Sequence, residues 1–126
     1  MEFKELPELV GQPLGWDMLK VIGKDGKKTL IERAFLLKKH VKKYKGKDLS
    51  RKSLLCVFTS EKHGKCVAFL EIEDLEGYLL SETVVLHMTS IKYIQDETWQ
   101  GINFLDQVKR SCRIKTEVLF QLIDSL

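Results

Sequence analysis

The sequence predicts a single α+β domain: an antiparallel meander of three to five strands, with a Lys-rich helix before the sheet and a long C-terminal helix after it. Three observations lead to this prediction. Apolar residues at helical spacing lie before the middle of the chain, β-type apolar runs joined by short turns fill the middle, and helical spacing returns at the end. Neighbouring strands that are joined by short loops pair in an antiparallel sense.

The chain has 126 residues, the length of one domain spanning 1–126, and it is long enough to bury a hydrophobic core. Its composition, 44% hydrophobic and 31% charged, is typical of a globular protein. Residues 1–15 contain both prolines, so we expect an irregular and flexible lead-in there. We expect no secretory signal at the start, and no apolar run approaches the roughly 20 residues that span a bilayer.

The three cysteines fall among apolar residues and form no CxxC pair. We therefore expect buried, reduced thiols and an intracellular protein, either cytoplasmic or nuclear. These cysteines are Cys56, Cys66 and Cys112.

The first helix is expected between residues 29 and 45, after a short strand at 16–22. Thr29 and Glu32 fit a capping box, and Gly46 is expected to stop the helix. Between them, apolar residues recur every three or four positions and form one stripe. The stripe consists of Leu30, Ala34, Leu37, Val41 and Tyr44.

Strands are expected at 54–59, 66–72 and 78–89, with 91–94 extending the last one and turns at 61–65 and 74–77. Asp96 is expected to cap the final helix, and Trp99 at its head is expected to bury against the sheet. The apolar side of this helix consists of Phe104, Val108, Cys112, Leu119, Leu122 and Leu126. The pattern lapses at Lys115, so one bent helix and two helices both fit residues 97–126.

Positive charge is concentrated in residues 24–52, which hold twelve Lys or Arg against three carboxylates, whereas the whole chain has a formal charge of +3. Like charges at helical spacing repel, so a helix that keeps them without acidic neighbours indicates an anionic partner. A solvated helix face is the alternative reading. The candidate nucleic-acid-binding residues are Lys38, Lys39, Lys42, Lys43, Lys45, Lys47, Arg51 and Lys52. Lys109, Arg110 and Arg113 form a secondary basic cluster on the last helix.

The leading hypothesis is a non-enzymatic protein that holds RNA or single-stranded DNA without strong sequence specificity, because lysines outnumber arginines in this segment. The alternative is a protein–protein module, such as an adaptor, inhibitor or assembly subunit, whose basic helix meets an acidic surface. Anionic lipid headgroups are a third hypothesis. The apolar C-terminal end would be covered by folding back onto the sheet, by a second copy in a homo-oligomer or by docking to a larger protein.

Two families show limited similarity. The order helix, three strands, helix over 29–126 resembles the double-stranded-RNA-binding domain, but residues 96–101 are acidic where that family has a Lys-rich motif. Gly15, Trp16, the Lys27–Lys28 pair and the run 33–37 are similar to the opening of pleckstrin-homology domains. That resemblance requires a strand at 31–37, against the helix signals there, so membership in neither family is inferred.

Signals for catalysis are lacking, and we expect neither an enzyme nor a cofactor or metal ion. The sequence contains no HExxH, CxxC or GxSxG motif. Residues 23–29 lie between an expected strand and an expected helix but do not match the spacing of a phosphate-binding P-loop.

Overall fold

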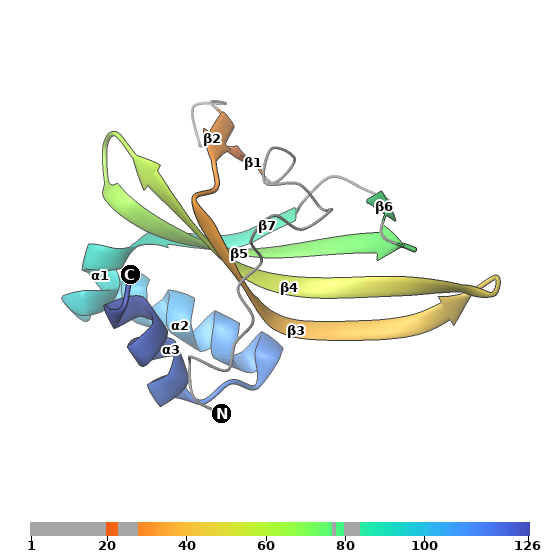
Figure 1. Cartoon of the computed structure of the whole chain (residues 1–126). Coiled ribbons are helices and arrows are strands. Elements are labelled where there is room, and N and C mark those ends of the chain that lie inside the picture. Colours follow the sequence, from red (N-terminus) through yellow and green to blue (C-terminus); the bar gives the residue numbers. More distant parts are fainter. Residues whose placement is uncertain (1–19, 23–27, 77, 80–83) are drawn as a thin grey trace.

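Three long strands form the centre of the structure (Figure 1): β3 (Arg33–Tyr44), β4 (Lys47–Ser60) and β5 (Gly64–Leu75). They are antiparallel neighbours, and β6 (Tyr78–Leu79) and β7 (Val84–Ser90) both pair with β5 to complete a five-stranded sheet. A separate two-stranded sheet consists of β1 (Lys20–Ile22) and β2 (Lys28–Leu30). The computed structural model describes residues 20–22, 28–76, 78–79 and 84–126.

The α+β class, the antiparallel meander and the helical C-terminal end are therefore confirmed. The expected irregular lead-in at 1–15, and residues 16–19 of the first expected strand, lie outside the described residues. The expected strands at 54–59 and 66–72 lie within β4 and β5, and the expected turn between them is present at 61–63.

The prediction of a Lys-rich helix is wrong, because residues 28–30 and 33–44 form strands β2 and β3. β3 pairs with β4 along its whole length, from Arg33 opposite Val57 to Tyr44 opposite Lys47. Lys45 and Gly46 connect them, and both have positive φ angles, 50° and 79°. A two-residue turn with both φ angles positive matches the twist of an antiparallel hairpin, so Gly46 closes a hairpin instead of stopping a helix.

The other helix signal at this end also has a different role. The Glu32 carboxylate does not serve a capping box but accepts a 2.6 Å hydrogen bond from the Thr59 hydroxyl of β4. The run 33–37 is apolar throughout, and a short run of this kind fits a buried strand as well as a helix. Pairing with β4 decides between the two.

Three helices follow the sheet: α1 (Ile91–Gln95), α2 (Trp99–Cys112) and α3 (Thr116–Asp124). Residues 91–94 are thus helical and do not extend a strand, since Ser90 caps α1 through a hydrogen bond from the Tyr93 backbone N–H. Asp96 ends α1, and Thr98 caps α2 in its place. The C-terminal part forms two helices, because Arg113 adopts a left-handed conformation after α2.

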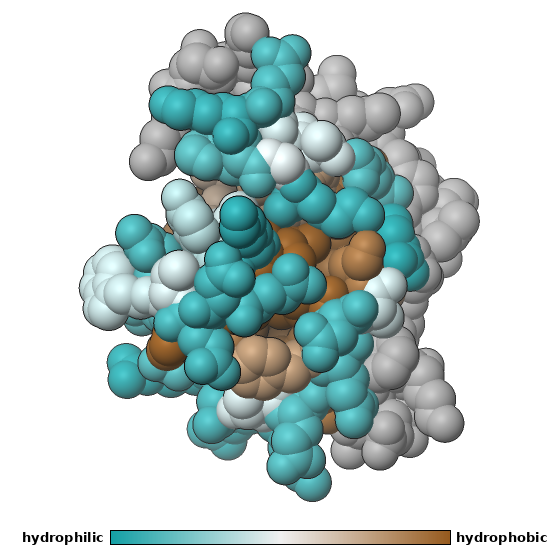
Figure 2. Space-filling view, turned by 90° about the vertical axis from the view of Figure 1, so that its left-hand side faces the viewer, coloured by the Kyte–Doolittle hydropathy of each residue, from teal (hydrophilic) through white to brown (hydrophobic). Residues whose placement is uncertain are grey.

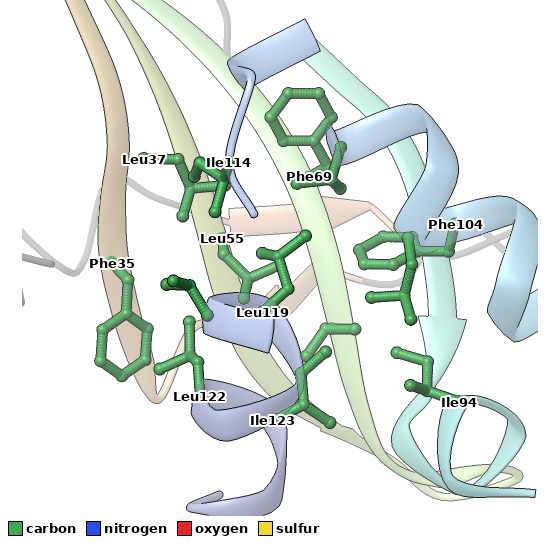
Figure 3. Packing of buried hydrophobic residues seen from close by; sticks show 14 of the residues in the cluster. Phe35, Leu37, Leu55, Phe69, Ile94, Phe104, Ile114, Leu119, Leu122 and Ile123 are labelled. Atoms are coloured by element: carbon green, nitrogen blue, oxygen red, sulfur yellow. The ribbon is translucent and has the colours of Figure 1, made fainter. Parts of the chain in front are cut away.

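The helices cover one face of the sheet, and the main core lies between them. Phe35, Leu55 and Phe69 point from the strands toward Phe104, Leu119 and other apolar residues of the helices (Figure 3). Leu122 and Ile123 of α3 are buried in this core. The apolar C-terminal end therefore folds back onto the sheet, which removes the reason for covering it with a second copy. All three cysteines are buried and free, as expected.

A second cluster of buried residues lies on the other face of the sheet and includes Leu54, Phe58 and Leu70. The same strands thus bury side chains on both faces at one end of the sheet. None of the helices in the described part of the chain is long and apolar enough to cross a bilayer.

At its other end the sheet extends beyond the helices (Figure 1). We call residues 38–52, the second half of β3, its turn and the first part of β4, the open hairpin. Every residue from 38 to 47 is exposed. Figure 2 views the opposite, helix-covered end, where hydrophilic side chains surround a central hydrophobic area.

Candidate anion-binding surface

All eight residues of the predicted basic segment lie in the open hairpin, but on strands and a turn instead of on one face of a helix. Val41 and Tyr44, expected in a buried stripe, are 45% and 50% exposed. The buried part of β3 ends at Leu37. The expected helix with a single cationic face is therefore not formed. The pairing of β3 with β4 determines on which face of the sheet each cation lies.

Alternation along paired strands distributes the cations over both faces of the hairpin. Lys38 pairs with Ser53, two residues from the core residue Leu55, so Lys38 points to the face that the helices cover. The bulge at Leu36–Lys38 puts Leu37 and Lys38 on this same face. The helix-side face carries Lys38, Lys42, Lys47 and Arg51, the opposite face carries Lys39, Lys43 and Lys52, and Lys45 is in the turn.

Carboxylates pair with three of the eight cations. Lys43 lies 2.6 Å from Asp48, and this neighbour raises the pKa of Lys43 through a hydrogen bond and its charge. Arg51 donates to Glu73 at 2.8 Å, and Lys52 lies 3.2 Å from the buried carboxylate of Asp74. These three cations are partly neutralised.

The other five form no ion pair with any described residue: Lys38, Lys39, Lys42, Lys45 and Lys47. Lys39 sits directly opposite Lys52, and like charges in this position destabilise a sheet. Lys45 lies over the Tyr44 ring at 5.4 Å from its centroid. Four of these five, all but Lys39, lie on the helix-side face or in the turn, so the charge available to a partner is concentrated there.

The secondary basic cluster lies beside the hairpin. The Lys38 ammonium donates a 3.4 Å hydrogen bond to the backbone carbonyl of Ser111, in the last turn of α2 between Arg110 and Cys112. Burial raises the pKa of the Cys112 thiol, while a hydrogen bond with Ser53 and the charge of Lys38 oppose that shift. The end of α2 thus packs against the start of the open hairpin.

This contact places the end of α2, which carries the secondary basic cluster, beside the start of the open hairpin. Lys109, Arg110 and Arg113 are all exposed and line an open hollow where α2 meets α3. We call the helix-side cations of the hairpin together with these three residues the composite basic face; it consists of Lys38, Lys42, Lys45, Lys47, Lys109, Arg110 and Arg113.

Sequence reasoning missed an exposed apolar corner where α1 meets α2. Trp99, expected to be buried, is 76% exposed, and Ile102 and Tyr93 are also exposed. Trp99 precedes Phe104 by five positions, which turns it about 140° away from the buried side of α2. This spacing is the signal that could have placed Trp99 on the surface.

Within the described residues, no group of three or more His, Cys, Asp or Glu side chains is arranged to hold a metal ion. The chain matches no protein-family model, and comparisons with curated proteins and with solved structures gave no match. The strand that the pleckstrin-homology resemblance required is present at 33–37, but no family membership follows from it.

Proposed function

We propose that this protein is a non-enzymatic binding protein that holds RNA or single-stranded DNA on its composite basic face, without strong sequence specificity. The observation that carries the proposal is the contact between Lys38 and Ser111, which joins the open hairpin to the basic end of α2. Clustered cations without acidic partners attract a polyanion through counterion release.

The chemistry of the face favours phosphate contact over base reading. Lysine ammoniums on flexible stems contact phosphates as point charges, whereas bidentate recognition of base edges favours arginine. Tyr44 is 50% exposed at the tip of the hairpin, and the exposed, flexible Lys45 that lies over its ring can move aside for a stacking base. Stacking of this kind is tolerant of sequence, which agrees with binding without strong sequence specificity.

A matched pair of double variants tests the proposal. Lys42→Gln with Lys47→Gln removes two cations of the composite basic face, and Lys62→Gln with Lys92→Gln removes two exposed lysines outside it. Binding of a fluorescent single-stranded RNA is measured by anisotropy across a salt series. We expect the first variant to bind about tenfold more weakly, and its slope of log affinity against log salt to fall by about 0.7 for each lost phosphate contact.

The control variant should bind like the unmodified protein. Equal losses in both variants would mean that net charge, and not this face, determines binding. No binding by the unmodified protein at low salt would refute the nucleic-acid proposal.

A second candidate is a protein–protein module, and the exposed apolar corner at Trp99, Ile102 and Tyr93 favours it. Trp and Tyr are enriched among residues that dominate protein interfaces. An interface centred on this corner would lose little affinity with added salt, and Trp99→Ala would weaken it while leaving RNA binding unchanged.

A further inference from the structure

The junction of α2 and α3 forms a hollow with an unusual lining. Arg113, with a φ angle of 55°, reverses the chain after α2, and α3 starts three residues later. The hollow at the end of α2 and along this connection is lined by Asp106, Lys109, Arg110, Arg113, Ile114 and Lys115. Ile114 is buried, so part of the wall is apolar, and the other five lining residues are exposed and charged.

Four of these charges are positive and one is negative. Lys109 and Arg110 lie in the last turn of α2, where cations stabilise the negative end of the helix dipole. Arg113, the C-cap residue of α2, lies at the same negative end, but the explanation does not extend to Lys115, which is the N-cap of α3. None of the four cations forms an ion pair with another described residue, although Asp106 is nearby.

The composition of the hollow differs from that of the open hairpin. Two of its four cations are arginines, whereas the five unpaired cations of the hairpin are all lysines. The planar guanidinium group can donate two parallel hydrogen bonds to a phosphate, which a lysine cannot do. A phosphate monoester also carries about −1.5 to −2 charges near neutral pH, more than the single charge of a backbone diester.

We infer that this hollow binds a phosphate monoester, the terminal 5′-phosphate of an oligonucleotide whose backbone lies along the open hairpin. The inference rests on the proposed function for the source of the phosphate. Four cations that line one hollow suit a compact dianion, and the buried Ile114 gives this hollow an apolar wall. The row of lysines on the hairpin suits the diesters that follow.

The first experiment compares two oligonucleotides of identical sequence, one with a 5′-phosphate and one with a 5′-hydroxyl, by anisotropy. The 5′-phosphorylated strand should bind about tenfold more tightly, the gain that charge-assisted hydrogen bonds to one group can give. In Arg110→Gln with Arg113→Gln, the two strands should bind equally. Lys92→Gln, which removes a cation from the last turn of α1, should keep the preference.

A further variant, Arg113→Lys, distinguishes the loss of phosphate contacts from a general disturbance of the structure. It keeps the positive charge but loses the planar guanidinium group. It should keep part of the preference, and its thermal midpoint should match that of the unmodified protein. Equal binding of the two strands by the unmodified protein overturns the inference, even if both bind tightly and the proposed function holds.

The second experiment needs no nucleic acid. Inorganic phosphate, added at millimolar concentration at constant ionic strength, should shift the backbone amide resonances of residues 109–115 and leave those of 60–65 unchanged. If oligonucleotides fail to bind but these shifts occur, the hollow binds phosphate and only the proposed function fails. If the shifts are absent, the hollow is no phosphate site.

Discussion

The two ends of β3 lie in different surroundings. Phe35 and Leu37 are buried between the sheet and the helices, whereas residues 38–44 of the same strand are all exposed. One continuous strand therefore has a core segment followed by a solvent-exposed segment. The helix-covered end is held by apolar packing, and the open hairpin is held by backbone pairing, its turn and a few ion pairs.

This contrast explains where unpaired cations are tolerated in the fold. The helix-covered end must bury its side chains, and an unpaired cation there would cost several kcal/mol, of the order measured when polar groups are buried alone. The exposed end has no such constraint, so five unpaired lysines are tolerated with the small penalties of surface repulsion. Apolar packing and unpaired charge thus lie in different parts of the same strands.

The largest effect on stability should come from a charge placed on the buried side of this boundary, and the same change on the exposed side should have little effect. Leu37→Asp buries a carboxylate in the core and should cost more than about 4 kcal/mol, enough to unfold the domain. Val41→Asp, four residues later on the same strand, should change the free energy of unfolding by no more than about 0.5 kcal/mol. Urea unfolding followed by circular dichroism measures both, and similar losses at the two positions would refute the boundary.

A smaller difference in stability is expected between alanine substitutions at two glycines. An added methyl group at Gly101 would lie 2.4 Å from the backbone oxygen of Tyr93, where α1 and α2 touch, whereas nothing lies within 4 Å of one at Gly46. We expect Gly101→Ala to cost about 2–3 kcal/mol through this clash. Gly46→Ala should cost about 1 kcal/mol through its positive φ angle alone. Thermal unfolding gives the order, and a greater loss at Gly46 would contradict the account.

The smallest expected effect concerns pH. Burial raises the pKa of the Cys56 thiol from its ordinary 9.0 to about 12, so the folded protein keeps the proton that the unfolded chain loses. The stabilisation is therefore complete below pH 9 and is lost as the pH rises toward 12. Near pH 10 the loss should be about 1 kcal/mol. Cys56→Ala should show a flatter decline of stability above pH 9, and an unchanged slope would contradict the burial of a neutral thiol.

Much of the fold could be predicted from the sequence where local and tertiary preferences agree. The apolar runs at 54–59 and 66–72 are bounded by turn residues and form strands as expected. The break at Lys115 is a real helix boundary. Periodicity in Phe104, Val108, Leu119 and Leu122 marks the buried side of the C-terminal helices.

The Lys-rich segment was mispredicted because its local signals fit two structures. Residues 30–44 have a helical repeat, but Val41 and Tyr44 in that repeat contact solvent and not the core. The hairpin turn at Lys45–Gly46 and the pairing of β3 with β4 decide the structure. Neither can be read from the spacing of apolar residues along a helix. The identity of the basic residues was predictable from composition, whereas their division between two sheet faces depends on register and on the bulge at Leu37.

The contact between Lys38 and Ser111 lay beyond sequence reasoning, because it joins residues 73 positions apart. Two basic clusters, at 38–52 and at 109–113, are recognisable in the sequence. A strand and a helix bring them together. The position of one cluster beside the other therefore depends on the tertiary structure.

The most direct test of the composite basic face is a titration of the ¹⁵N-labelled protein with a single-stranded RNA at low salt, followed by amide chemical shifts. The account predicts that amides of residues 38–47 and 109–113 shift together, with one common saturation curve, and that added salt reverses the shifts. Shifts confined to the corner around Trp99, or movement of the hairpin without the end of α2, would contradict it.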